Sequence, residues 1–339
     1  MPCPSQRIGF LGADQTLPRC EQHPAFRLRS GPILAKQALA LSGAPRLRAV
    51  RDQSKRLGVT HPHGWPRGQS TIRKRTGPWC ARSARMAIDA VIFDVNGTLV
   101  DIATDEWGDR TLGVLKYHLR YCGVRLGRRH LRANLRAAVK RHVESSTHPY
   151  PELDWTLVWR DVVGEAGAFD HGRLAGPSAE AEERRAQFCL DLARLHRSAA
   201  RTHLRAFPGA LAMLDTLRQR YALAIVTDAQ WAFARPELEE LGIAERVPHI
   251  TVSGEHGIRK PDERLFRDAL QALGVTADRA VYVGNDPFRD VHGAQAAGMR
   301  AILVGDKKAA ATMPVGHKPD GRVKQVRDVI PVIEALARG

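Results

Sequence analysis

The stretch from residue 88 to residue 101, which reads IDAVIFDVNGTLVD, constrains the fold more than any other part of this chain. It contains a short continuous apolar run, Ala90–Phe93, which is typical of a strand buried on both faces of a sheet. Asp94 follows the run directly, and Gly97 then favours a turn. Because ligands bind at the carboxyl ends of strands in open α/β sheets, Asp94 is a candidate reactive carboxylate.

Apolar strand patterns and helical patterns alternate again in the carboxyl-terminal part of the chain. Helices are expected after Pro208 and after Pro261, and a short terminal helix at 329–336. Further strands are expected at Ala222–Thr227, His249–Val252, 280–283 and 301–304. This alternation predicts a doubly wound α/β fold, in which helices cover both faces of a parallel sheet.

Residues 102–205 show a helical pattern instead. Apolar residues recur at three- and four-residue steps, as Leu112, Leu115 and Leu119 do, and a long charged helix is expected at about 179–203. The sequence therefore predicts a helical region inserted after the first strand.

The amino-terminal part, residues 1–85, differs from the rest in charge. It holds 16 basic and 3 acidic residues, whereas the remaining residues hold 36 basic and 33 acidic ones. The segment lacks apolar periodicity, so we expect a disordered extension. It could bind nucleic acid through phosphates, or it could be a targeting segment. We favour a third interpretation, in which the native protein begins at Met86. The remaining residues are nearly neutral, so we do not expect the folded part to bind nucleic acid.

Five scattered cysteines show no C-x-x-C pair and no metal-ligand spacing. They indicate free thiols in a reducing compartment, so a cytoplasmic protein is expected. No apolar run approaches 18 residues, and a membrane-spanning helix is therefore not expected. The oligomeric state is left open.

Three later motifs accompany the first one in a fixed order. A strand ends at Thr227, Lys260 stands in GIRKPDERLF just before a helix, and VYVGNDPFRD ends a strand in an acidic cluster. Together the four motifs resemble those of the haloacid dehalogenase-like (HAD) hydrolase superfamily, over roughly residues 87–305. The resemblance implies a Rossmann-like core, 86–101 and 206–339, and a helical cap, 102–205, that closes over the active site.

The resemblance also implies roles for individual side chains. Asp94 would be the nucleophile and would form a covalent aspartyl intermediate. Thr227, with Asp228 beside it, would bind a transferring phosphoryl oxygen. Lys260 would neutralise the charge on the nucleophile and the phosphoryl group. The implied substrate is a small phosphorylated metabolite.

The acidic cluster resembles the magnesium motif of the same superfamily. Mg²⁺ prefers oxygen ligands and takes one or two carboxylates. The expected ligands are Asp94, the backbone carbonyl of Asn96, and Asp286 or Asp290. The first position of the cluster is usually Asp but is Asn285 here. The sequence therefore leaves open which carboxylate binds the metal directly.

Asn96 is the larger departure from the family pattern. HAD phosphatases usually carry a second Asp there, which protonates the leaving group and later activates water. An amide cannot exchange protons in this way. A phosphatase could use another acid such as Asp228 or a cap residue, or it could act only on good leaving groups. A 2-haloacid dehalogenase needs no proton donor, because a halide leaves unprotonated. A catalytically impaired binding protein is the third alternative, and the metal motif and Lys260 favour the phosphatase.

Overall fold

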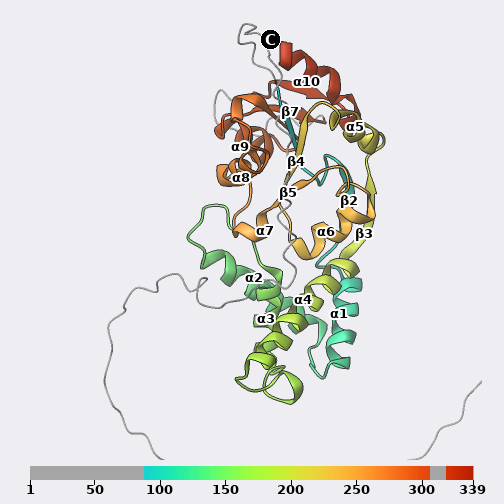
Figure 1. Ribbon diagram of the computed structural model, residues 1–339. Coiled ribbons are helices and arrows are strands. Elements are labelled where there is room, and N and C mark those ends of the chain that lie inside the picture. The colour runs from blue at the N-terminus through green and yellow to red at the C-terminus, as the bar shows by residue number, and fades with distance from the viewer. Residues whose placement is uncertain (1–87, 306–317, 339) are drawn as a thin grey trace, which may run out of the picture. The chain divides into compact units, whose positions relative to one another are not determined.

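A computed structural model describes residues 88–305 and 318–338, which lie within one structural unit, Pro78–Gly339. The expectations for residues 1–85 fall outside the described residues. Four α-helices follow one another between the second and third strands, and strands and helices alternate from the third strand to the seventh (Figure 1). The strands are β1 Ala90–Phe93, β2 Val100–Thr104, β3 Arg201–Ala206, β4 Ala222–Thr227, β5 His249–Val252, β6 Ala280–Gly284, β7 Arg300–Val304 and β8 Gly321–Val323. The α-helices are α1 Asp109–Tyr121, α2 Arg128–Glu144, α3 Trp155–Glu165, α4 Ala179–Ala200, α5 Ala210–Leu217, α6 Trp231–Glu240, α7 Ser253–His256, α8 Glu263–Leu273, α9 Gly293–Ala296 and α10 Val329–Arg338.

Six strands of the described residues form a parallel sheet in the order β5-β4-β1-β6-β7-β8. The strand β1 lies inside the sheet, between β4 and β6. All four of its residues are buried, as its continuous apolar run predicts. The expected parallel α/β fold with a helical insertion is confirmed.

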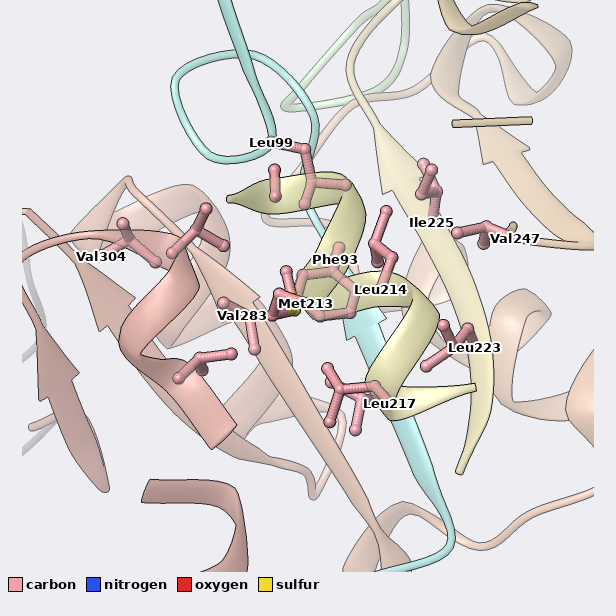
Figure 2. Close-up of a cluster of buried hydrophobic side chains, with 14 of the residues drawn as sticks. Phe93, Leu99, Met213, Leu214, Leu217, Leu223, Ile225, Val247, Val283 and Val304 are labelled. Carbon is pink, nitrogen blue, oxygen red and sulfur yellow. The ribbon is translucent and has the colours of Figure 1, made fainter. Parts of the chain in front are cut away.

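The side chains of β1 alternate between two hydrophobic clusters on opposite faces of the sheet. Val91 and Phe93 belong to the cluster that α5 and α10 cover, whereas Ala90 and Ile92 belong to the cluster that α8 and α9 cover. In Figure 2, Met213 and Leu214 of α5 lie over Phe93. Full burial of a side chain such as Phe93 contributes about 1.5–3 kcal/mol. The position of Asp94 is therefore fixed by a strand that is packed on both faces.

The helical insertion begins and ends in a two-stranded antiparallel ribbon of β2 and β3. The helices α1 to α4 lie between these strands and surround a hydrophobic cluster of their own, which includes Leu112, Leu131, Trp159 and Leu192. Figure 1 shows the four helices gathered as one group. The expectation of a helical pattern over all of 102–205 is wrong at both ends, where β2 and β3 pair. Helix α4 consequently ends at Ala200.

The strand β8 is a second difference from the sequence-based expectation. It is three residues long and adds to the edge of the sheet beside β7. The expected terminal helix is present as α10. None of the helices in residues 88–305 and 318–338 is long and apolar enough to cross a membrane.

Candidate active site

Asp94 lies in the first turn after β1, at the carboxyl end of the sheet. Its backbone N–H donates to Val283 O over 2.9 Å, which extends the pairing of β1 with β6 by one bond. Asp94 is buried, with only 8% of its side chain exposed. The Thr98 hydroxyl donates to Asp94 Oδ2 over 2.9 Å, so the turn itself orients the carboxylate.

Gly97 allows this turn to approach the loop after β6. Its φ of 82° is in the left-handed region, and a Cβ at this position would overlap the side-chain amide nitrogen of Asn285. The loops that follow β1 and β6 are therefore in direct contact beside Asp94.

Gly97→Ala is expected to destabilise the protein for two reasons. The left-handed backbone costs about 1–2 kcal/mol for an alanine, and the end of the Asn285 side chain has to move aside as well. Gly123→Ala is a matched control, because Gly123 has φ 88° but no atom within 4 Å of an added Cβ. In urea unfolding, Gly97→Ala should lose at least as much stability as Gly123→Ala. A smaller loss would contradict the left-handed turn at Gly97.

Lys260 binds the Asp94 carboxylate directly. It stands just before α8 and is 3% exposed. Its Nζ donates to Asp94 Oδ1 over 2.7 Å, to Asp290 Oδ1 over 2.6 Å and to the Tyr282 hydroxyl over 3.2 Å. All three ammonium protons therefore have acceptors, and the charged amine is fixed beside Asp94.

The charge of Lys260 is maintained by its neighbours. Burial opposes the charged amine, but the carboxylates of Asp290 and Asp94 outweigh burial and raise the pKa of Lys260 well above its ordinary value. Burial also raises the pKa of Tyr282 well above its ordinary value, so the phenol stays neutral. It can then donate to Val226 O over 3.0 Å while accepting from Lys260.

Asp290 and Asp286 occupy different environments. Asp290 is 1% exposed, and its Oδ2 accepts from the backbone N–H groups of Asn285 and Asp286, each over 2.9 Å. Asp286 caps the π-helical turn Pro287–His292, accepts from the Phe288 and Arg289 amides, and pairs with the Arg289 guanidinium. The two carboxylates therefore point in different directions, Asp290 toward Lys260 and Asp286 toward Arg289.

Thr227 and Asp228 end the neighbouring strand β4. Thr227 is buried and lines a small cleft together with Asn96. Asp228 Oδ1 accepts from the backbone N–H of Lys260 over 2.9 Å, and Arg289 Nη1 lies 3.4 Å from Asp228 Oδ2. Asp228 thus holds the main chain of Lys260 in place.

The structure brings some of the predicted site residues into contact and separates others. Asp94, Lys260 and Asp290 form one hydrogen-bonded group, and Thr227 and Asn96 share a cleft. Asp286 instead caps its own helix. Sequence reasoning missed Tyr282, because a tyrosine inside an apolar strand shows no sign that its hydroxyl meets a lysine.

The residues expected to hold Mg²⁺ belong to the loops after β1 and β6, which meet at Gly97 and Asn285. Within the described residues no three His, Cys, Asp or Glu side chains gather into a metal-binding group. The Asp94 carboxylate, the predicted Asn96 carbonyl and the Asn285 side chain provide one charged and two neutral oxygens. Mg²⁺ accepts one carboxylate and keeps several waters, so this set fits the ion. Direct binding of the metal by Asp286 or Asp290 stays a prediction. Asp290 would have to give up its hydrogen bond with Lys260 in order to bind the ion.

The insertion reaches the core beside Lys260. Pro151 and Ile258 form an antiparallel β-bridge. The Arg259 N–H donates to Tyr150 O over 2.9 Å, and the Glu152 N–H donates to Gly257 O over 3.1 Å. The loop that joins α2 to α3 is therefore paired with the residues that immediately precede Lys260.

A cavity of about 150 Å³ lies between the insertion and the core. The core contributes Asn96 and Asp228 to its lining, and the insertion contributes Glu106, Glu152, Trp155, His196 and Arg197. Arg197 also forms two hydrogen bonds of 2.8 and 3.0 Å to the Glu237 carboxylate on α6. The cavity therefore joins polar side chains of both parts next to the Asp94 turn.

Comparisons with known proteins agree with this arrangement. A family described as haloacid dehalogenase-like hydrolase matches residues 88–298. A phosphoserine phosphatase of Thermus thermophilus is 42% identical over 131 residues, which cover 38% of this chain and 51% of the relative. An N-acetylmuramic acid 6-phosphate phosphatase of Pseudomonas aeruginosa is 29% identical over 227 residues, which cover 65% and 83%.

The first three curated relatives are matched over only 51%, 56% and 60% of their own lengths. Among solved structures, a 2-haloacid dehalogenase from Pseudomonas syringae shares the fold with a TM-score of 0.51 and 23% identity. That match covers 73% of this chain and 98% of the other.

Proposed function

Because this chain belongs to the haloacid dehalogenase-like hydrolases, we propose that it hydrolyses a small phosphorylated metabolite through an aspartyl-phosphate intermediate on Asp94. The observation that carries the proposal is the contact of Lys260 with both Asp94 and Asp290. A fixed ammonium beside the nucleophile offsets the negative charge that a phosphoryl group brings, and it needs no reorganisation during the reaction.

In the first step an Asp94 oxygen forms a bond to phosphorus while the bond from phosphorus to the leaving oxygen breaks. The Thr227 hydroxyl donates a hydrogen bond to a phosphoryl oxygen, and Lys260 stabilises the charge shared with Asp94. In the second step water attacks phosphorus, the bond to Asp94 breaks and phosphate leaves. Mg²⁺, held by Asp94, Asn96 and Asn285, would supply further positive charge to the phosphoryl oxygens.

The helical insertion acts as a cap in this proposal. Its residues, 102–205, would form the cap domain, and 86–101 with 206–339 would form the catalytic core. Support comes from the cavity between the two parts and from the pairing of the insertion with the segment before Lys260. A cap in this position excludes water from the aspartyl-phosphate and selects the substrate. We also propose a cytoplasmic location, because Cys122 and Cys189 are free thiols.

A 2-haloacid dehalogenase is the second candidate, and Asn96 is the observation that favours it. A halide leaves without a proton, so an amide at this position costs such an enzyme nothing. The bridging Lys260 and the oxygen atoms suited to Mg²⁺ favour phosphoryl transfer instead. A catalytically impaired binding protein would leave the contact of Lys260 with Asp94 without a use.

A substrate panel tests the proposed function. Phosphoserine, glyceraldehyde 3-phosphate, phosphoglycolate, N-acetylmuramic acid 6-phosphate, an acyl phosphate and 2-chloropropionate are incubated with the protein, with Mg²⁺ or with a chelator. We expect phosphate release from at least one ester, and a fall of about tenfold or more with the chelator, because bound metal contributes several kcal/mol. Halide release that resists the chelator, with no phosphate release, would establish the dehalogenase instead.

A further inference from the structure

The amide of Asn96 leaves the first chemical step without a proton donor. An alkoxide is a poor leaving group unless it is protonated as its bond to phosphorus breaks, and general acid catalysis contributes typically 10²–10⁴-fold. A replacement donor has to face the same space as Asn96. Glu237 lines the small cleft with Asn96, but it is paired with Arg197 at 2.8 Å. Of the described residues, three further carboxyl side chains share the larger cavity with Asn96, namely Glu106, Glu152 and Asp228.

Two of these carboxyls are held by other groups. Asp228 accepts from the Lys260 backbone and lies near the Arg289 guanidinium, so its carboxyl oxygens already have partners. Glu106 Oε1 lies 3.7 Å from Arg197 Nη1, so it is paired with a cation of the same cavity. The imidazole of His196 also lines the cavity, but burial lowers its pKa, and a neutral imidazole is a poor acid.

Glu152 differs from both because no cationic side chain of residues 88–305 and 318–338 lies within hydrogen-bond distance of its carboxyl oxygens. Its Oε2 accepts from the Ser253 hydroxyl over 2.6 Å, and its Oε1 accepts from the Leu153 N–H over 3.0 Å. Its main chain is paired with Gly257, three residues before Lys260. The carboxyl group is therefore fixed against the core from both its side chain and its backbone.

The surroundings of Glu152 raise its pKa above the ordinary value of a glutamate. Burial raises the pKa of Glu152, and the nearby Asp228 carboxylate acts in the same direction. The hydrogen bonds from Ser253 and from the Leu153 amide, and the charge of Arg259, oppose this shift without reversing it. Glu152 consequently holds a proton to higher pH than an exposed glutamate does.

We propose that Glu152, on the insertion, is the general acid and base that replaces the carboxyl missing at position 96, an inference that rests on the proposed phosphatase activity. As Asp94 attacks phosphorus and the bond to the leaving oxygen breaks, the Glu152 proton passes to that oxygen. The Glu152 carboxylate then takes a proton from the water that attacks the aspartyl-phosphate. Phosphate leaves, Asp94 is free again, and Glu152 is protonated for the next cycle.

This assignment makes catalysis depend on the docking of the insertion. The acid is in place only while the segment around Pro151 is paired with Ile258 beside Lys260. Asp94 belongs to the core and Glu152 to the insertion. When the insertion is not docked, the proton donor is missing, and alkyl esters are not cleaved.

Glu152→Gln tests the inference, with an alkyl phosphate and p-nitrophenyl phosphate compared in the presence of Mg²⁺. We expect kcat for the alkyl ester to fall about 10²–10⁴-fold and kcat for the aryl ester to fall far less, because nitrophenolate leaves without a proton. The variant should also lose the decline in wild-type kcat that accompanies deprotonation of Glu152 as pH rises. Glu106→Gln is the matched control, since Glu106 is a carboxyl of the same cavity, and it should keep the wild-type ratio of the two rates.

Asn96→Asp in the Glu152→Gln background gives a second readout. A carboxyl restored at position 96 should recover alkyl ester hydrolysis by about tenfold or more, while the melting temperature of each variant reports on folding. An equal loss on both esters, or no recovery in the double variant, would show that Glu152 only docks the insertion and would overturn the inference alone. If the wild type releases no phosphate in an Asp94-dependent manner, the proposed function fails, and this inference fails with it.

Discussion

Asp94→Asn is expected to abolish turnover while the fold stays intact. The amide has nearly the same shape as the carboxylate, so it can still accept a hydrogen bond from Lys260 or Thr98. It is a poor nucleophile, and removal of a nucleophile typically lowers kcat on the order of 10⁴-fold or more. Acid-quenched samples of the wild type should contain a phosphorylated protein, and those of the variant should not.

The control for this variant is Asp89→Asn, the same change just before the other end of β1. Asp89 is paired with the half-exposed Arg279 and lies away from the carboxyl ends of the strands. Its replacement should alter kcat by less than about twofold, since surface substitutions are usually within 0.5 kcal/mol. Wild-type turnover by the Asp94 variant, on a substrate that the native protein hydrolyses, would refute the aspartyl mechanism.

Lys260→Met is expected to reduce both stability and activity strongly. The substitution leaves the buried carboxylates of Asp94 and Asp290 without their shared cation. Removing one partner of a buried ion pair costs about 3–5 kcal/mol, which corresponds to a fall in melting temperature on the order of 10 °C. Calorimetry measures the stability, and phosphate release measures the activity.

Two variants make this result specific. Lys140→Met removes an exposed lysine of α2 that pairs with Glu144 at 3.7 Å, and it should cost less than about 1 kcal/mol. Asp290→Asn added to Lys260→Met should recover part of the lost stability, because it removes one of the unpaired charges. A Lys260 variant with the same melting temperature as the wild type would show that the three charged groups are not buried together.

Five of the six strands of the main sheet, all but β8, could be predicted because each of them carries a local signal. Ala90–Phe93 and Ala222–Thr227 are uninterrupted apolar runs, and both have the predicted bounds in the structure. The ribbon of β2 and β3 carries no such signal. Its strands are about a hundred residues apart and half exposed, so only their pairing makes them strands.

The candidate site was predictable to a similar extent. The motif positions of Asp94 and Lys260 place both residues at the carboxyl edge of the sheet, where they meet. The spacing of Asp286 and Asp290 could not distinguish their environments, because the π-helical turn decides which carboxylate faces inward. Glu152 lies in the loop between α2 and α3 and belongs to none of the four motifs. Its burial depends on docking against Ser253, which a single sequence does not reveal.

The β2–β3 ribbon has a consequence for how such a protein can diversify. The two ends of the insertion leave the core as adjacent paired strands, about 5 Å apart. For the core, the whole insertion therefore takes the place of the loop of a β-hairpin. Lengthening a loop between paired strands costs little closure entropy. Helices between the strands can be exchanged for others without shifting any strand of the main sheet. A new set of helices must still include one short extended segment that pairs with Ile258. That segment must also carry a carboxyl group at the position of Glu152.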